Sequence, residues 1–140
     1  AEVFGRCRRV GALKDKGIRV SLFVEPDPKQ LDAAAKLGAD IVELHTGRYC
    51  DLIDEAREIE LKRIADAAAA TENLGLECHA GHGLTFDTVG PVAAIPNVVE
   101  LNIGHFLIGE AIFSGLDSAI RRMRSLMDKA RSDARGERSA

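Results

Sequence analysis

The segment HAGHGLTFDTVGPVAAIPNVVELNIGHFLIGEAI (79–112) holds three of the four histidines of this 140-residue chain. Two of them, His82 and His105, adjoin glycine, in Gly81-His82-Gly83 and in Gly104-His105. Each His–Gly cluster follows a short apolar run typical of a strand and precedes a stretch with helical character. The segment therefore predicts two successive strand–helix units, each with an imidazole and a glycine where its strand ends.

The same alternation extends along the rest of the chain. Short apolar runs predict strands at 18–24, 40–45, 76–80 and 97–103. Capping residues, glycine stops and helical spacing predict helices at 1–16, 27–37, 53–74, 85–94, 105–112 and 115–133. Strict alternation of this kind indicates an α/β fold with parallel strands covered by helices. We expect a single domain over residues 1–140, with a disordered tail at 132–140.

Each predicted strand has one apolar and one polar face. In the second strand, for example, Val42 and Leu44 alternate with Glu43 and His45. Crossover helices need the apolar face, so in a closed parallel barrel the polar face would line the interior. Carboxylates and imidazoles are costly to enclose unless they pair or take part in chemistry, which indicates a functional interior. The alternative is an open sheet whose polar face meets solvent.

The glycines of the two clusters predict a phosphate site. Ligands of parallel β/α folds bind at the carboxyl ends of the strands. Glycine lets backbone N–H groups approach an anion closely, and a helix that begins after Gly104 would direct its free N–H groups to the same place. We therefore expect a phosphate between Gly83 and Gly104-His105. Glycine-rich turns also occur for tight geometry alone.

Two residues are candidates for acid–base chemistry. His82 lies beside the predicted phosphate, where an imidazole can act as a general acid or base near neutral pH; alternatively it orients a loop. The second candidate is Glu43, which faces inward from the second strand. The alternative to an acid–base role for Glu43 is a structural ion pair with Arg19. His45 and His79 could instead ligate a metal, although one histidine on each of two strands is weak evidence for a metal site.

Composition excludes several classes of partner. The net charge is −3 and aromatic residues make up only 4% of the chain, so nucleic acid is not an expected partner. No apolar run approaches the roughly 20 residues that span a bilayer, and the N-terminal residues lack the apolar region of a signal peptide. The three cysteines match no disulfide or zinc pattern. We expect a cytoplasmic protein with reduced thiols.

Four segments in order, VSLFVEPDPKQ, IVELHTGRY, HAGHGLTF and VVELNIGHFLIGEAIFSGL, resemble the pyridoxine 5′-phosphate synthase family. The resemblance runs from about Ile18 to the last helix and implies the parallel β/α units of a TIM-type barrel in a homo-oligomer, usually an octamer. The implied reaction condenses 3-amino-2-oxopropyl phosphate with 1-deoxy-D-xylulose 5-phosphate, giving pyridoxine 5′-phosphate, phosphate and water. No metal or organic cofactor is implied.

Carried over motif by motif, the resemblance gives roles to five residues. His82 of GHGL corresponds to the proton donor and Glu43 of VELHTG to the carboxylate of the site, while Gly83, Gly104 and His105 correspond to contacts with the aminoketone phosphate. Chains of this family run to about 240 residues, as barrels do, whereas only four strands are predicted here. We therefore expect a half barrel that lacks the N-terminal half and is inactive alone. The alternatives are another phosphate-binding β/α-barrel enzyme and a non-catalytic half-barrel fragment.

Overall fold

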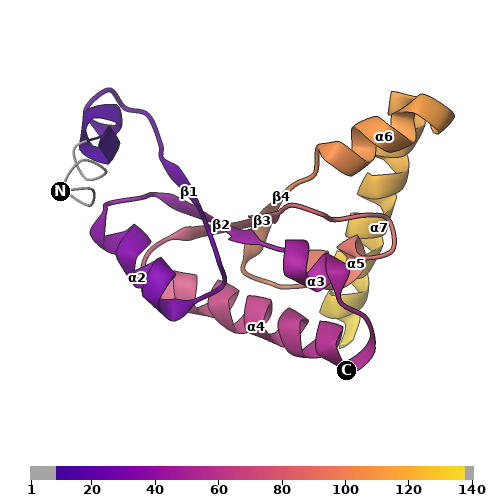
Figure 1. Cartoon of the computed structure of the whole chain (residues 1–140), viewed down its shortest axis with the longest axis horizontal. Helices are drawn as coiled ribbons and strands as arrows, with labels where there is room; N and C mark the ends of the chain where they lie inside the picture. Colours follow the sequence, from indigo (N-terminus) through magenta and orange to yellow (C-terminus); the bar gives the residue numbers. More distant parts are fainter. Residues whose placement is uncertain (1–8, 138–140) are drawn as a thin grey trace.

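The computed structural model describes residues 9–137, and within them the sheet is parallel and open (Figure 1). Its strands lie in chain order: β1 (Ser21–Val24), β2 (Ile41–His45), β3 (Glu77–Gly81) and β4 (Val98–Asn102). The helices are α2 (Pro28–Lys36), α3 (Gly47–Asp51), α4 (Asp54–Asn73), α5 (Val89–Ala93), α6 (His105–Ser114) and α7 (Leu116–Glu137). The predicted α/β class and the four parallel strands are confirmed. Four strands do not close a barrel, so β1 and β4 remain edges within the described chain.

The core fills the space between one face of the sheet and the helices that return the chain between strands. Figure 1 shows α2 and α4 together on the same side of the sheet. Leu31 on α2 and Ile64 on α4 are fully buried there, against Val42 and Leu44 of β2. Helices α2 and α4 thus cover the apolar faces predicted for the strands. The polar faces lie on the opposite side of the sheet. Within residues 9–137, no second layer covers that polar side.

Local sequence explains where the helices begin. The side chain of Asp27 accepts a hydrogen bond of 2.8 Å from the backbone N–H of Lys29, and Pro28 occupies the first turn, where its missing N–H costs nothing. Gly38 and Gly75 follow α2 and α4 with positive φ angles of 81° and 68°, which glycine adopts without strain. These positions match the predicted caps and stops.

The fourth strand departs from the predicted alternation. The alternation of Val99, Leu101 and Ile103 in the predicted strand at 97–103 places Val99 on the apolar face. In the structure Val99 is 64% exposed, whereas Val98 is buried. The pairing of β3 with β4 shifts at this point, because Cys78 pairs with Val98 while the next residue, His79, pairs with Glu100. Val99 is therefore the extra residue of a β-bulge. After the bulge, Leu101 and Asn102 take the predicted faces.

Several element boundaries also differ from prediction. The first strand begins at Ser21 rather than residue 18. Just before it, the N–H of Val20 donates to the Asp40 side chain, and the Val20 carbonyl accepts from the N–H groups of Asp40 and Ile41. Helix α7 continues through Glu137, so residues 132–137 of the expected tail are helical, and residues 138–140 lie outside the described part. Of the helix expected at 1–16, residues 9–14 are helical and residues 1–8 lie outside the described part.

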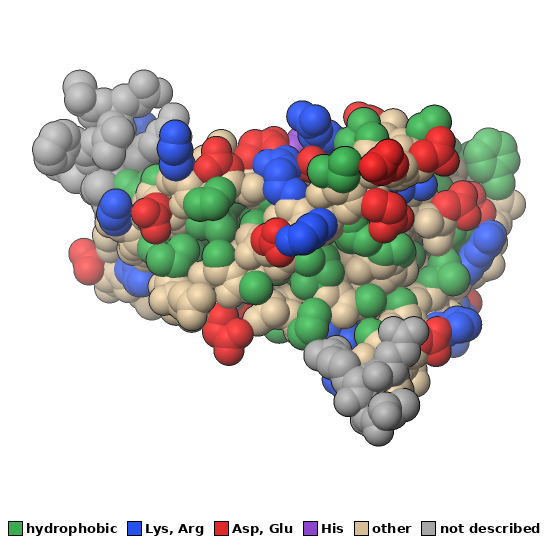
Figure 2. All heavy atoms as spheres, turned by 90° about the horizontal axis from the view of Figure 1, so that it is seen from below, with side chains coloured by type: hydrophobic (Ala, Val, Ile, Leu, Met, Phe, Trp, Pro, Cys, Tyr) green, Lys and Arg blue, Asp and Glu red, His purple; other side chains and the backbone are tan. Residues whose placement is uncertain are grey.

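The surface carries both signs of charge. Figure 2 shows Lys and Arg side chains interspersed with Asp and Glu on the face that it presents, without a continuous basic area. None of the helices in the described chain has the length and apolar character that a membrane span requires.

Removing the side chain of Leu44 tests the core. Leu44 is fully buried at the centre of the sheet, so Leu44→Ala should lower the free energy of unfolding by about 2–5 kcal/mol. Ile53→Ala is the matched control, since Ile53 is 67% exposed and should change stability by less than about 1 kcal/mol. Urea denaturation of both variants measures the difference. Equal losses would show that the core does not lie where the structure has it.

The thiol of Cys78 gives the core a pH-dependent contribution. Burial raises the pKa of this thiol to about 11, from an ordinary value near 9. The unfolded chain therefore ionises the thiol first, so its contribution is complete below pH 9 and is lost as the pH rises to 11. The stability advantage of the wild type over Cys78→Ala should shrink across this window by up to about 2 kcal/mol. A constant difference between pH 8 and 11 would contradict the burial of this thiol.

Candidate active site

A cavity of about 560 Å³ lies at the carboxyl ends of the strands. All five predicted site residues line it: Glu43, His82, Gly83, Gly104 and His105. They come from β2, from the turn after β3 and from the turn and helix after β4. The structure therefore brings together two clusters that lie more than 20 positions apart in the sequence. The other lining residues are Phe23, Leu84, Thr85, Asn102, Ile103 and Phe106.

Glu43 reaches across the sheet to Asn102. The Asn102 side-chain amide donates a hydrogen bond of 2.9 Å to Oε2 of Glu43, and Gly81 of β3 lies between the two strands that carry them. A Cβ on Gly81 would collide with Oε1 of Glu43 and would lie 2.8 Å from the Asn102 carbonyl oxygen. The missing side chain at position 81 thus makes room for the carboxylate. The alternative ion pair of Glu43 with Arg19 is not formed, because Arg19 binds Glu77 at 2.9 Å.

His82 has an unusual backbone conformation for a non-glycine residue, with φ at 78°. Such a conformation persists only where the surroundings enforce it. The buried hydroxyl of Thr46 lies 2.7 Å from the Gly81 carbonyl oxygen and 2.6 Å from that of His82, and the Thr46 N–H donates to Gly81 as well. This clamp turns the chain after β3, so that the His82 side chain is exposed at the cavity.

Gly104 is the N-cap of α6 and contributes no side chain to the cavity. The first intrahelical bond runs from the N–H of Ile108 to the Gly104 carbonyl, which leaves the preceding N–H groups of the first turn without a helical acceptor. A Cβ built on Gly104 would meet no atom within 4 Å. The free N–H groups and the open space beside them are the features that an anion-binding helix start requires.

The other two histidines of the polar face are held by carboxylates. Nδ1 of His45 lies 2.8 Å from Glu25, and His79 lies 2.8 Å from Glu77 and 3.4 Å from Glu100. Among residues 9–137, no group of three or more His, Cys, Asp or Glu side chains could hold a metal ion. The histidines of the second and third strands thus have neighbouring carboxylates as their partners.

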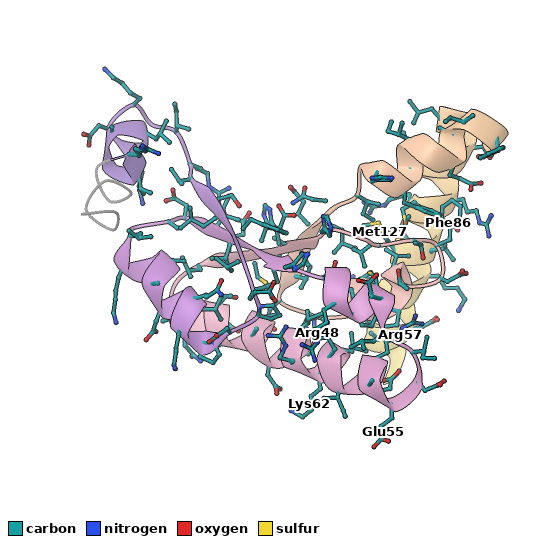
Figure 3. All side chains as sticks on the ribbon, in the orientation of Figure 1. Arg48, Glu55, Arg57, Lys62, Phe86 and Met127 are labelled. Carbon is teal, nitrogen blue, oxygen red and sulfur yellow. The ribbon has the colours of Figure 1, made fainter. Side chains whose placement is uncertain are left out.

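Sequence reasoning missed two features of the site. Arg48 and Tyr49 lie between the strand predicted at 40–45 and the helix predicted at 53–74, but they belong to helix α3. The Tyr49 ring is buried there, and its hydroxyl donates to the Thr88 carbonyl at 3.1 Å. Phe86 packs edge-on against Phe106, with 4.8 Å between the ring centroids, which ties the turn after β3 to the start of α6; Figure 3 shows Phe86 beside α6 and α7. In the sequence, the aromatic residues Tyr49, Phe86 and Phe106 were the features that could have indicated these contacts.

Comparison with known proteins adds a second, independent line of evidence. The sequence model of a family described as "Pyridoxal phosphate biosynthesis protein PdxJ" matches residues 7–129, which is most of the chain. The chain belongs to this family. The expected resemblance is therefore confirmed, and the four parallel strands are those of half a β/α barrel of the PdxJ type.

Curated relatives from several bacteria share the name pyridoxine 5'-phosphate synthase. Pyridoxine 5'-phosphate synthase of Rhodospirillum rubrum is 65% identical over 122 residues, covering 86% of this chain and 49% of the relative. The protein of that name from Caulobacter vibrioides is 58% identical over 135 residues (94% and 51%), and that from Roseobacter denitrificans is 55% identical over 126 residues (87% and 51%). The chain thus spans about half the length of the curated relatives it matches.

Two carboxylates on the polar face of this PdxJ family member are ionised near neutral pH. Burial alone would raise the pKa of Glu25, but hydrogen bonds and charge from His45 and Arg63 outweigh burial and lower it. Hydrogen bonds from His79 and Arg19 lower the pKa of Glu77. Any contribution of these pairs to stability is present above the unfolded pKa and is lost as the pH falls through the lowered folded value.

Adding a methyl group at Gly81 should disturb the site from within. In Gly81→Ala the new Cβ competes with Glu43 and Asn102 for the same space, so we expect a loss of about 1–3 kcal/mol in the free energy of unfolding. Gly109→Ala on α6 is the control, because a Cβ there meets nothing within 4 Å. Chemical denaturation of both variants decides the matter, and equal stabilities would contradict the close approach of Glu43 to β3.

Proposed function

We propose that this chain carries the aminoketone-phosphate part of the active site of a pyridoxine 5′-phosphate synthase. The complete enzyme would condense 3-amino-2-oxopropyl phosphate with 1-deoxy-D-xylulose 5-phosphate, giving pyridoxine 5′-phosphate, phosphate and water. The observation that carries the proposal is the convergence of His82, Glu43, Gly83, Gly104 and His105 on one cavity. Its volume lies within the range of small-molecule sites.

In this proposal the phosphate of the aminoketone binds between Gly83 and Gly104-His105. Backbone N–H groups at the start of α6 donate to the phosphate oxygens, and the positive end of the helix dipole favours the dianion. Gly83 and Gly104 are both exposed, and Gly104 leaves open space beside it, so the peptide groups of both turns are accessible. Imidazole N–H of His105, at the first position of the helix, would supply a further donor.

His82 and Glu43 then serve the proton transfers. Imine formation, loss of phosphate, hydration and ring closure each move a proton, so the reaction needs positioned acids and bases. His82 would donate protons from the edge of the cavity, and Glu43, oriented by Asn102, would stabilise positive charge that develops on the nitrogen-containing intermediate. Holding two phosphorylated substrates side by side would supply much of the remaining rate. No cofactor has a role in this scheme.

The sheet also bears on assembly and location. Both edge strands and the polar face are uncovered within the described chain, so we propose that full turnover requires further strands to enclose the cavity, in a homo-oligomeric enzyme. The phosphorylated substrates cannot diffuse across membranes, which favours the cytoplasm, where thiols such as Cys50 and Cys78 stay reduced.

An added negative charge at the helix start tests the phosphate site. Gly104→Asp should weaken the binding of inorganic phosphate by at least about tenfold, because a carboxylate would occupy the proposed anion position. Gly109→Asp is the matched control: it adds the same charge to α6 beyond its first turn. Titration of the purified chain by calorimetry, together with thermal unfolding, gives both affinity and stability.

Four outcomes are distinguishable. Loss of phosphate binding in the Gly104 variant alone supports the proposal. Phosphate affinity equal in both variants and the wild type favours the non-catalytic half barrel, and tighter binding of an unrelated sugar phosphate than of the aminoketone phosphate favours a different barrel enzyme. Turnover of both substrates by the purified 140-residue chain would contradict the need for further strands.

A further inference from the structure

The proposed chemistry gives no role to His45, although its ring lies directly beside that of His82. It ends β2, and its ring centroid lies 4.9 Å from that of His82, with 51° between the two planes. Phe23 of β1 packs edge-on against the same His45 ring at 5.1 Å and lies 6.3 Å from His82. The three rings therefore form a cluster in which the exposed His82 side chain rests against His45.

The His45 ring is anchored from the helix layer. Its Nδ1 lies 2.8 Å from Oε1 of Glu25, whose other oxygen lies 3.3 Å from a guanidinium nitrogen of Arg63 on α4. Arg63 in turn holds the buried Glu60 with several hydrogen bonds and donates to the Pro26 carbonyl. Because the ionised Glu25 carboxylate can only accept, Nδ1 of His45 must carry the proton. The anchor fixes both the orientation and the protonated nitrogen of the ring.

Glycine at position 47 allows the two imidazoles to approach α3. A Cβ on Gly47 would lie 2.7 Å from Nε2 of His45, which is closer than real Cβ contacts allow, and 3.0 Å from Cδ2 of His82, which is a tight contact. Helix α3 thus begins directly against both rings. Together with the Thr46 clamp on the His82 backbone, this packing leaves His82 little room to turn.

We propose that His45 is a positioning residue that holds the imidazole of His82 in one orientation toward the cavity, through a relay from Arg63 and Glu25. The proposal rests on the proposed function for the identity of His82 as the proton donor, but the geometry that it asserts exists without substrate. His45 does not line the cavity, so it acts through His82 and not on the reacting atoms.

Nuclear magnetic resonance of the purified chain, with labelled histidine, tests the positioning directly. In the wild type, the ring nitrogen shifts should show His45 protonated at Nδ1, and side-chain couplings should show one rotamer for His82. In His45→Ala the His82 couplings should average over several rotamers. His45→Phe should restore the single rotamer, because a phenyl ring can pack on Phe23 without a polar partner.

The anchor is tested separately with Glu25→Ala. Without the carboxylate, His45 should lose its fixed tautomer and turn toward water, and His82 should again average. Glu55→Ala is the matched control, since Glu55 lies exposed at the far end of α4 (Figure 3) and should leave both signals unchanged. If His82 keeps one rotamer in folded His45→Ala or, should that variant not fold, in Glu25→Ala, the proposal is overturned.

Inorganic phosphate separates this inference from the proposed function. His45→Ala should leave phosphate affinity within about twofold of the wild type, because His45 is not among the proposed phosphate ligands. The wild-type chain could bind no phosphate while His82 still keeps one rotamer in the wild type and averages over several in His45→Ala. In that case the proposed function fails and the positioning role stands. A loss of phosphate binding in His45→Ala as large as in Gly104→Asp would make His45 part of the binding site and would overturn its role as a positioning residue.

Discussion

The parallel pairing of β2 with β3 is the interaction on which the site depends. The register pairs Glu43 with His79 and His45 with Gly81. The turns that follow the two strands therefore lie next to each other at the same edge of the sheet. Only with this alignment can the Thr46 hydroxyl, just beyond β2, reach the carbonyls of Gly81 and His82 just beyond β3. Backbone hydrogen bonds that are not specific to any residue type thereby fix the relative position of residues with specific chemistry.

The same pairing separates packing from chemistry. Side chains that alternate toward α2 and α4 supply the apolar burial, and those on the other face form pairs such as Arg19 with Glu77 and Glu43 with Asn102. A core substitution and a site substitution therefore act on opposite sides of one sheet. The functional face can hold carboxylates and imidazoles because its neighbours satisfy them, so their desolvation is partly offset.

Much of this arrangement follows from local pattern. The period-two alternation in IVELH predicted which face Glu43 would take, and the rule that ligands bind at the carboxyl ends of parallel strands predicted that the two His–Gly turns would share a cavity. Other features depend on contacts between distant segments. Helix α3 has only five residues, which are too few to show a helical period. The sequence pattern therefore did not indicate that Tyr49 is buried. The choice of Glu77 over Glu43 as the partner of Arg19 depends on side-chain reach across strands, which alternation does not encode.

The bulge at Val99 shifts the register between β3 and β4 by one residue. Without the extra residue, the ladder would place Leu101 level with Gly81 and turn Asn102 toward the helices. Glu43 would then face an isobutyl group instead of an amide, and the chain beyond the strand would leave the sheet on the wrong side to deliver Gly104 to the cavity. A single unpaired valine, with no polar atom in its side chain, thus determines which side chains of β4 lie on the polar face of the sheet.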